Sequence, residues 1–520
     1  MKSRWIRGAW VLLTIGVVCL MPNVYADDLL TMGVTALRNQ DASLTGTGVP
    51  VGEAEALAST NPPAFEINPT TVGEPQTFFD WISTNGTFAS FPNADGAESA
   101  HADAVGQNIF GAAQGVSPGI AHLDNYEADY FYQYDVVDAT SITDQVVNQS
   151  FTFGVEPPDE EPIDSAYDDY VANNGAIFSS ATVGIGTSPG APGTAYNCIG
   201  IGAYGAGAVV IIGPTLDNGR SKPDIVAPGT VVSLTAPYVT GAAAVLVQAG
   251  ARGDGGTNTT AAVDWRTVKA LVLNGALKPF DWANSSTAPL DQRYGAGVLN
   301  LYYSYQQLAE GQQPYTSSET APEGGPYPPV SSGAAEPAAG WDFETITTLL
   351  SDTVNHYLFD VTNDSTFTGT LDWERHVEET GINNLGLLLY NATNGVLLGS
   401  STSSVDNVQH VYLPHVLPGK YDLEVVKYGG ISQSVTPSET YALAFQFFPI
   451  SPPALTVTPE ATNIVVTWPS SPTVFILQQT ESLAPPVSWS NVTNTEWITN
   501  NTMWVSVNTS GNVSFYRLTR

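Results

Sequence analysis

The order of apolar and polar positions divides the chain into two kinds of region. Between residues 27 and about 310, short β-branched runs stand between stretches that carry the helical period of apolar residues. The runs typical of buried strands are 146–153 (VVNQSFTF), 175–181 (GAIFSSA) and 198–204 (CIGIGAY), and those typical of helices are 100–109, 242–248 and 265–274. This alternation predicts an α/β unit over residues 27–310, with a parallel sheet covered by helices on both faces.

The helical period disappears after Trp341. Residues 311–340 are rich in Pro, Gly, Ser and Ala, which predicts an extended and mobile linker. Residues 341–448 hold short apolar runs such as HYLFDV, LGLLLYN and YDLEVV with turn residues between them, a pattern that predicts an antiparallel β-sandwich. Residues 454–520 repeat the pattern on a smaller scale (NIVVTWP, MWVSVN) and predict a second, small all-β module.

Residues 1–26 have the three parts of a secretory signal peptide. A basic start is followed by the apolar run Ala9–Met21 and by a Val-Tyr-Ala sequence that ends at Ala26, after which we expect cleavage. The apolar run is too short for a membrane anchor, and the residues that follow Cys19 fit a lipoprotein site poorly. No later segment is expected to span a bilayer, so the sequence predicts a secreted or extracytoplasmic protein.

Charge and cysteine content limit the partners and the chemistry. The chain has 50 acidic and 16 basic residues, a formal net charge of −34. Such an excess of negative charge argues against nucleic acid and anionic membranes as partners. Cys198 is the only cysteine after the predicted leader and lies in an apolar strand-like run, so we expect a core residue rather than a disulfide or a thiol nucleophile. The sequence shows no Cys/His spacing typical of a metal site and no phosphate-binding glycine loop.

Residues 221–250 contain the strongest candidate for chemistry. A turn segment with two prolines leads to Ser233, and an Ala/Val-rich stretch with helical character follows. A serine in the first turn of a buried helix would point its Oγ out of the turn, beside backbone N–H groups that have no helical partner. This position suits a nucleophile whose reaction places negative charge on a neighbouring oxygen. The alternative is that Ser233 is only the N-cap of a core helix.

A base and an acid for such a serine lie upstream. His101 stands where a helix is expected to begin, so its imidazole could take a proton at the rim of the sheet; a partly exposed helical histidine is the alternative. Glu53 and Glu55 share one face of the first expected strand. A carboxylate at the end of that strand could orient the imidazole, although a solvated strand end is the alternative. His122 alternates with apolar residues and is expected at an ordinary strand position.

Together these segments resemble the subtilisin-like serine proteases over residues 45–305, in the family's order of acid, histidine and serine. The similar segments are TGTGVPVGEAEA (45–56), SAHADAVGQ (99–107), GVSPGIAHL (115–123), VVNQSFTFG (146–154), SKPDIVAPG (221–229), SLTAPYVTGAAAVL (233–246), WRTVKALVLNGA (265–276) and YGAGVLNL (294–301). The resemblance implies that Ser233 is the nucleophile, His101 the base and Glu55 the acid. It further implies that a peptide substrate binds along a strand edge formed by Ser150, Phe151, Thr152 and Gly154.

The chain departs from the family's pattern at several positions. Its acid is Glu where the family has Asp, and Val183 stands where the family places an oxyanion-binding asparagine. Val231 and Val232 replace Gly-Thr before the nucleophile, and the loop ahead of it is shorter. Loss of one oxyanion donor typically costs about a hundred- to a thousand-fold in rate. The sequence alone places neither Asn148 nor Asn174 in the oxyanion site.

The resemblance predicts a secreted serine endopeptidase that acts on proteins or peptides and requires no cofactor. Subtilisin-like proteases often bind structural calcium, and this acidic chain could hold such ions. The departures leave a second hypothesis open, an inactive protease fold that serves as a secreted binding or surface protein. A non-proteolytic esterase that uses the same serine is a third.

The regions after the linker resemble accessory modules. Residues 341–448 resemble the pre-peptidase C-terminal β-sandwich of secreted bacterial proteases, through the segments 385–401 (LGLLLYNATNGVLLGSS) and 417–426 (LPGKYDLEVV). Residues 454–520 are similar to fibronectin-like or carbohydrate-binding modules. Both regions are expected to bind or target rather than catalyse, with carbohydrate or a cell surface as the expected contact.

Overall fold

The computed structural model describes residues 24–519, apart from 156–158, 184–185, 349, 430–434, 452, 461–462, 501 and 509–513. Most of the predicted signal peptide, residues 1–23, therefore lies outside the described residues. The first described helix, α1 (Val24–Thr31), begins within the last three residues of that predicted leader.

The α/β unit is built on an eight-stranded sheet in the order β10-β9-β8-β7-β1-β6-β3-β4. Its strands are β1 (Val51–Glu55), β3 (Phe79–Ser83), β4 (Gly86–Phe88), β6 (Leu123–Glu127), β7 (Val146–Gln149), β8 (Ile177–Ala181), β9 (Ile199–Tyr204) and β10 (Ile225–Pro228). Every neighbouring pair is parallel except the edge pair of β3 and β4. The predicted α/β class with a parallel sheet is confirmed, and the β1, β7, β8, β9 and β10 strands are buried along their whole length, as expected for such a sheet.

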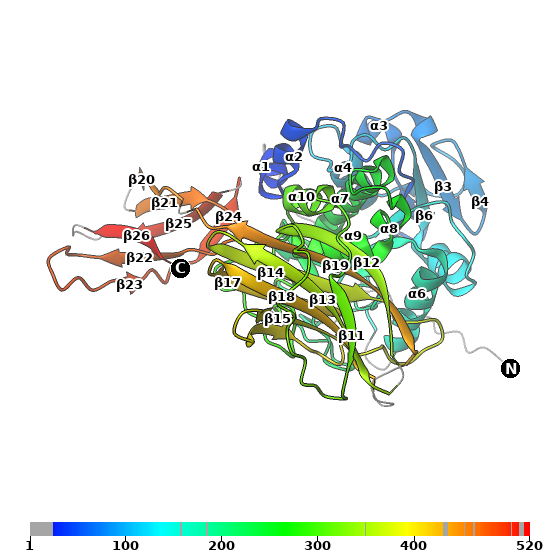
Figure 1. The fold of residues 1–520 in the computed structure, drawn as a ribbon. Coiled ribbons are helices and arrows are strands. Elements are labelled where there is room, and N and C mark those ends of the chain that lie inside the picture. Colours follow the sequence, from blue (N-terminus) through cyan, green and yellow to red (C-terminus); the bar gives the residue numbers. More distant parts are fainter. Residues whose placement is uncertain are drawn as a thin grey trace.

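Helices and short segments surround this sheet (Figure 1). They are α2 (Val34–Gln40), α3 (Pro69–Val72), α4 (Ala100–Phe110), α5 (Ala128–Tyr130), α6 (Glu161–Asn174), α7 (Val232–Arg252), α8 (Thr259–Ala262), α9 (Trp265–Asn274), α10 (Leu301–Ala309), η1 (Gln76–Phe78), the π-helix η2 (Phe131–Val137) and the two-stranded ladder β2 (Ala64–Glu66) with β5 (Ala97–Glu98). Helix α7 packs against α4 and against strands β7 to β10. It is the central helix of the unit.

Helix α7 corrects one expectation. Its 21 residues are long and apolar enough, by length and composition, to cross a membrane, whereas no segment of this kind was expected after the leader. Of its most apolar window, 83% is buried inside the protein, because the helix contacts the sheet on one side and α4, α9 and α10 on others. The hydropathy of α7 is therefore explained by its central place in the core.

The order of the strands creates a reversal beside β1. After β1 the chain builds β3, β4 and β6 on one side, and it then crosses to β7 and proceeds outward to β10 on the other side. Parallel strands bring their carboxyl ends to one edge of the sheet, and a reversal of strand order leaves a crevice at that edge. The end of β1, at Glu55, faces this crevice.

A β-sandwich follows, with a five-stranded sheet (β11-β13-β18-β15-β16) and a four-stranded sheet (β12-β19-β14-β17). The strands are β11 (Ser317–Ala321), β12 (Ala339–Thr347), β13 (Asp352–Val361), β14 (Ser365–Trp373), β15 (Leu385–Asn391), β16 (Val396–Ser401), β17 (Val408–Val416), β18 (Gly419–Lys427) and β19 (Ser438–Pro449). A core of Phe, Tyr, Leu and Val side chains fills the space between the sheets.

The predicted linker is corrected by strand β11. Residues 317–321 pair antiparallel with β13, and the Gln313 N–H donates to the Trp341 carbonyl at 2.7 Å. An edge strand offers a row of unpaired backbone groups, which a neighbouring extended segment of any composition can satisfy. The Pro/Gly/Ser-rich composition predicted the extended conformation but missed this pairing.

The last module holds two small antiparallel sheets, β20-β21-β25-β24 and β23-β22-β26. Their strands are β20 (Thr456–Glu460), β21 (Asn463–Pro469), β22 (Ile476–Thr480), β23 (Ser490–Asn491), β24 (Glu496–Thr499), β25 (Thr502–Asn508) and β26 (Phe515–Thr519). The module projects from one end of the molecule in Figure 1. Its apolar residues Val466 and Trp468 share a cluster with Tyr204 and Val226 of the α/β unit.

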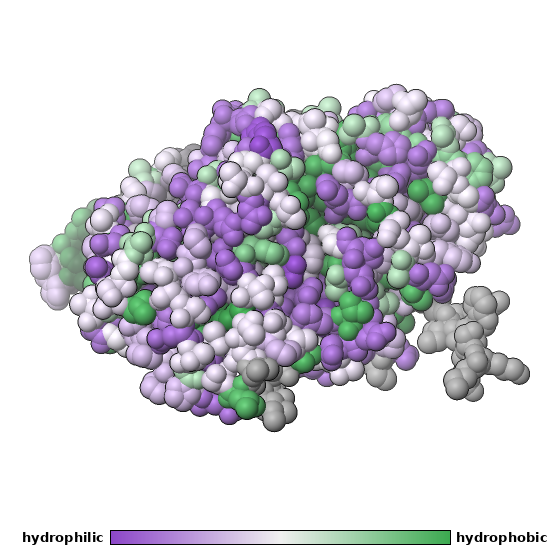
Figure 2. All heavy atoms as spheres, turned by 45° about the vertical axis from the view of Figure 1, so that its right-hand side comes forward, coloured by the Kyte–Doolittle hydropathy of each residue, from purple (hydrophilic) through white to green (hydrophobic). Residues whose placement is uncertain are grey.

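The sandwich is packed firmly on the α/β unit. Strands β14 and β19 contact α9, and Trp341, Ala442 and Ala444 join the core of the α/β unit. Lys269 Nζ of α9 lies 3.2 Å from Asp372 Oδ1 of β14, and both side chains are fully buried. Outside these interfaces, the face shown in Figure 2 is mostly hydrophilic, and its apolar side chains form only small groups.

Candidate active site

Glu55 and His101 are brought together by the ends of two elements. Glu55 is the last residue of β1, and its side chain is only 3% exposed. His101 is the second residue of α4, whose N-cap is Ser99. The Ser99 hydroxyl accepts a hydrogen bond from the Ala102 N–H and lies 3.2 Å from Glu55 Oε1, to which it donates. Ser99 thus fixes the start of the helix to the carboxylate.

The imidazole of His101 lies between a carboxylate and a hydroxyl. Its Nδ1 is 2.8 Å from Glu55 Oε1, and its Nε2 is 2.9 Å from Ser233 Oγ. With an ionised Glu55, Nδ1–H donates to the carboxylate, and Nε2 is left to accept the Ser233 proton. Three side chains separated by up to 178 positions in sequence therefore form one continuous chain of hydrogen bonds at the carboxyl edge of the sheet.

Ser233 occupies the first turn of α7, as its second residue. The N-cap is Val231, which makes no side-chain capping bond, so the alternative that Ser233 is the N-cap is wrong. The Ser233 N–H is one of the first four backbone N–H groups of the helix, which have no helical carbonyl partner one turn earlier. Pro237 in the next turn has no N–H to donate to the Ser233 carbonyl.

The connection that presents Ser233 is short. Only Gly229, Thr230 and Val231 join β10 to α7. Gly229 has a φ of +144°, and a Cβ there would approach Thr235 Cγ2 to 2.7 Å, so the position needs glycine. The sheet end and the helix start are thereby held close, and the serine stays at the rim.

The electrostatics of the site favour a charged imidazole. Burial opposes protonation of His101, but the negative charge of Glu55 and the hydrogen bond to it outweigh burial and raise the pKa of the imidazole. The His101 side chain is still 34% exposed, so a substrate can reach its ring. A histidine that gains a proton readily beside a hydroxyl is suited to act as a general base.

Beneath the rim lies a layer of three buried polar side chains, of which the sequence patterns had singled out Glu53 and Asn148 but not Asn125. Glu53, Asn125 and Asn148 pair in register on β1, β6 and β7, and all three are fully buried. Burial, and then the charges of Glu55 and Asp103, raise the pKa of Glu53 well above its ordinary value. Burial and these neighbouring charges therefore favour the neutral form of Glu53. Ser99, the N-cap of α4, was also not singled out from the sequence. Unlike Asn125 it had a recognisable signal, because a serine directly before an apolar helical pattern is typical of an N-cap.

The predicted substrate-binding residues follow β7 without forming regular strand. Gln149 pairs with Ala54 of β1, so residues 150–154 leave the sheet beside the end of β1. Ser150 and Phe151 are largely buried, Thr152 is half-buried, and the Phe153 N–H donates to the Ala191 carbonyl at 3.0 Å. Gly154 has a φ of +59°. Their contact with a substrate stays a prediction.

The family resemblance predicts an oxyanion donor at the position of Val183. Val183 follows β8 and forms a bridge with Pro189, and the next two residues lie outside the described ranges. Asn148 donates to Ser150 Oγ at 2.9 Å and accepts from Thr240, so its amide is held inside the core. Asn174 ends α6 before β8 begins, which places it at the opposite, amino edge of the sheet. Of these side chains, Val183 is the one beside the rim.

A hollow of about 490 Å³ adjoins Glu55. It is lined by residues 56–60 and 127–129, which follow the carboxyl ends of β1 and β6. Burial raises the pKa of Glu127 in its wall to about 7. The hollow therefore begins at the residue after Glu55, and neither His101 nor Ser233 lines it.

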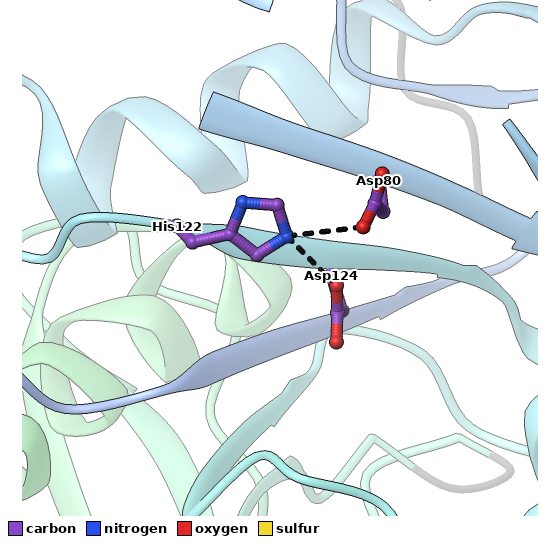
Figure 3. Close-up of side chains that lie close together, drawn as sticks. All are labelled: Asp80, His122 and Asp124. Carbon is purple, nitrogen blue, oxygen red and sulfur yellow. Dashed lines mark hydrogen bonds and ion pairs between the residues drawn. The ribbon is translucent and has the colours of Figure 1, made fainter. Parts of the chain in front are cut away.

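His122 lies just before β6 and does not join this group. Its Nε2 is 3.4 Å from Asp80 Oδ2 and 3.1 Å from Asp124 Oδ1 (Figure 3). Asp80 and Asp124 are register partners on β3 and β6, near the amino ends of those strands. His122 thus lies beside two carboxylates at the edge of the sheet opposite the rim, and not at the ordinary strand position that was expected. Together with Asp80 and Asp124 it could hold a metal ion, as could His356, Asp422 and Glu424, or Glu374, His376 and Glu439.

No protein-family model matches the chain, and no curated protein matches it. Among solved structures, the chain is similar to MycP1 from Mycobacterium smegmatis at 18% identity, over 55% of this chain and 86% of that chain, with a TM-score of 0.35. It is similar to tripeptidyl peptidase 2 at 10% identity, over 81% of this chain and 54% of that chain, with a TM-score of 0.27. The pre-peptidase C-terminal domain of a collagenase from Bacillus anthracis aligns at 17% identity over 20% of this chain and 87% of that domain, with a TM-score of 0.15. Similarities at these TM-scores carry no functional argument.

Proposed function

We propose that the protein is a secreted serine endopeptidase of the subtilisin-like type. The observation that carries this proposal is the pair of contacts made by His101, 2.8 Å to Glu55 Oε1 and 2.9 Å to Ser233 Oγ. A hydroxyl, an imidazole and a carboxylate in this order form the arrangement that activates serine nucleophiles. The arrangement stands at the carboxyl edge of a parallel sheet, beside the reversal of strand order.

In the proposed reaction, Ser233 Oγ attacks the carbonyl carbon of a peptide bond while His101 Nε2 takes the hydroxyl proton. Glu55 stabilises the imidazolium through Nδ1–H. His101 then gives the proton to the leaving amine, and the C–N bond breaks to leave an acyl group on Ser233. Water attacks this ester with His101 again as the base, and the acid product leaves as Ser233 regains its proton.

The developing oxyanion would be stabilised mainly by the Ser233 N–H at the start of α7. With Val183 where the family resemblance places an asparagine, one side-chain donor is absent from that position. We therefore expect turnover about a hundred- to a thousand-fold below that of a site with both donors. The substrate is proposed to lie as an extended chain along Ser150, Phe151, Thr152 and Gly154.

The remaining regions are proposed to serve this activity from outside the cytoplasm, after removal of the leader. The α/β unit (27–310) would hydrolyse the substrate with no required cofactor, and structural calcium would serve stability alone. The sandwich (341–448) and the last module (454–520) would bind a carbohydrate or a cell surface.

The alternative proposal, an inactive binding protein, is favoured by Val183, Val231 and Val232 at positions where the family resemblance places catalytic and loop residues. A fluorophosphonate probe separates the two, because it reacts only with an activated serine. We expect labelling of the wild-type protein, and no labelling of Ser233→Ala or His101→Ala. Absence of labelling in correctly folded wild type would favour the inactive protein, and turnover of esters without turnover of peptides would favour an esterase.

A further inference from the structure

The outer face of the five-stranded sheet is closed by a segment that we name the strap, residues 322–338, between β11 and β12. The strap is fixed to the sheet at several points. Gly324 N–H and Tyr327 O–H donate to Asp352 Oδ2 at 2.8 and 2.7 Å. Val330 N–H donates to Asp422 Oδ2 at 2.7 Å, and Glu336 N–H donates to the Leu358 carbonyl at 2.7 Å. Several side chains on this face, among them His356, Asp422 and Glu424, are therefore removed from water.

Three of the covered side chains are ionisable. His356 of β13 pairs in register with Glu424 of β18, and Asp422 is two residues away from Glu424 on the same face. The alternate residues of these strands, such as Tyr357 and Leu423, fill the sandwich core, so the ionisable side chains point to the strap side. His356, Asp422 and Glu424 are all 0% exposed.

Their polar atoms are poorly satisfied by the protein. His356 Nδ1 lies 2.8 Å from Asp422 Oδ2 and 3.8 Å from Glu424 Oε1. Among the described residues, both carboxylate oxygens of Glu424 and Oδ1 of Asp422 have no hydrogen-bond partner. Two buried carboxylates beside one imidazole are costly unless a further positive charge is present. Burial, then Asp422 and Glu319, raise the pKa of Glu424 to about 9, which reflects the same shortage of positive charge.

We propose that His356, Asp422 and Glu424 bind a divalent transition-metal ion, with Zn²⁺ as the best-fitting representative. The ligand atoms of the three side chains lie within 4.8 Å of one another. Bonds of about 2.0–2.2 Å place neighbouring ligand atoms roughly 3.3–3.5 Å apart, so only small side-chain adjustments are needed. One imidazole nitrogen with two carboxylates suits Zn²⁺ or a similar ion, whereas Ca²⁺ and Mg²⁺ prefer sets made of oxygen alone.

The surroundings offer groups that could orient the ligands. Metal-bound histidines usually direct their other ring nitrogen to a carboxylate. His356 Nε2 has no hydrogen-bond partner among the described residues and faces Glu319 Oε1 of β11 at 3.8 Å, so a small movement of the exposed Glu319 side chain would supply this contact. The Val330 N–H of the strap holds Asp422 in place. A bound ion would thus connect β13 and β18 directly, and β11 and the strap through Glu319 and the Val330 N–H. It would help to hold the Pro/Gly-rich strap against the sheet.

The two other candidate clusters are less suited to an ion. In the cluster of Asp80, His122 and Asp124, the side chains of His122 and Asp80 are 43% and 36% exposed, so water can solvate them without an ion. In the cluster of Glu374, His376 and Glu439, each ring nitrogen of His376 is paired with its own carboxylate, at 3.0 and 2.9 Å. These clusters supply matched controls, because each contains one histidine with two acids.

The test uses the full chain carrying Ser233→Ala, so that self-cleavage cannot occur, after removal of metal with a chelator. Zn²⁺ is titrated in competition with a chromophoric chelator, and Co²⁺ is followed by its visible absorption. We expect one tight Zn²⁺ site per chain and a Co²⁺ spectrum typical of nitrogen and oxygen ligands. His356→Gln and Glu424→Gln should each weaken binding more than about 100-fold, and Glu319→Gln about tenfold. Zn²⁺ should also raise the Tm of the parent and not of the two ligand variants.

Several outcomes would overturn the assignment. One is a folded parent chain that takes up no Zn²⁺ or Co²⁺; another is uptake of Ca²⁺ without Zn²⁺. A third is a site lost in His122→Gln or His376→Gln but kept in His356→Gln. Glu424→Gln has nearly the shape of a protonated glutamate, and its near-UV circular dichroism without metal should match the parent, so a binding loss is not a folding loss.

Discussion

Two histidines of this protein make the same contact with a carboxylate in very different places. His101 Nδ1 lies 2.8 Å from Glu55 at the rim of the parallel sheet, and His356 Nδ1 lies 2.8 Å from Asp422 under the strap of the sandwich. At the rim, the second nitrogen meets the Ser233 hydroxyl at 2.9 Å and the ring is partly open to solvent. Under the strap, the second nitrogen faces a carboxylate and the ring is sealed.

The difference shows that a histidine–carboxylate pair does not by itself define a chemistry. The chemistry of each histidine depends on which group its second ring nitrogen faces and on whether a substrate can reach that nitrogen. A hydroxyl and access favour proton transfer, whereas additional carboxylates and exclusion of water favour a bound cation.

The largest effect is expected from removal of the nucleophile or its base. Ser233→Ala and His101→Ala should each lower kcat for peptide hydrolysis by up to about 10⁶-fold, and the double variant should lose little more, since the two residues act as a unit. His356→Gln should leave kcat within about threefold of wild type, because the sandwich pair faces no substrate. Steady-state kinetics on a peptide substrate compare the wild type with these four variants. Additive losses in the double variant would contradict a shared proton transfer.

The next effect concerns the carboxylate that orients the base. Glu55→Gln should lower kcat about 10⁴-fold with little change in KM, because the amide cannot stabilise the imidazolium or hold the required tautomer. The matched change in the sandwich, Asp422→Asn, should leave kcat intact and reduce Zn²⁺ binding instead. An equal loss of activity in both variants would show that the sandwich pair supports the rim, and the separation of the two sites would fail.

The sequence predicted those site residues that belong to a pattern of adjacent residues. It predicted less well those whose role depends on segments far away in the chain. The Ala/Val-rich run after Ser233 and the apolar period after His101 predicted two helix starts, because helical pattern is a property of adjacent residues. Glu55 was harder, since a short strand of alternating Glu and Ala looks like a solvated edge until neighbouring strands β6 and β7 cover it. The carboxylate gains its role only from that burial and from the Ser99 hydroxyl.

The sandwich cluster had no usable signal. His356, Asp422 and Glu424 alternate with core residues, which is the ordinary pattern of a strand with one solvated face. The strap that covers them is Pro/Gly-rich and was predicted to be mobile. Its attachment depends on backbone groups of an edge strand and on carboxylates far away in sequence, and neither is visible in local composition. For this reason the local sequence pattern predicted neither the attachment of the strap nor the burial of the side chains beneath it.

A smaller effect is expected in the pH dependence of kcat/KM. His101 must be neutral to take the serine proton, so activity should fall about tenfold per unit as pH drops below its raised pKa. Glu55 is what raises this pKa against burial, so in Glu55→Gln the residual activity should persist to lower pH. Glu424→Gln should not move the profile. If the acid side of the pH profile moved to higher pH in Glu55→Gln, the proposal that Glu55 raises the pKa of His101 would be contradicted.

The smallest effect is expected at Glu53, two residues before the catalytic candidate on the same face of β1. Since burial and neighbouring charges keep Glu53 protonated, Glu53→Gln replaces one neutral group by another of similar shape. We expect kcat/KM within about threefold of wild type, less than roughly 0.7 kcal/mol in the barrier, and an unmoved acid limb. If Glu53 were ionised instead, its removal would take away a negative charge near His101, and the limb would move to lower pH. The same substitution therefore tests whether Glu55 alone, or Glu53 as well, carries a negative charge that raises the pKa of His101.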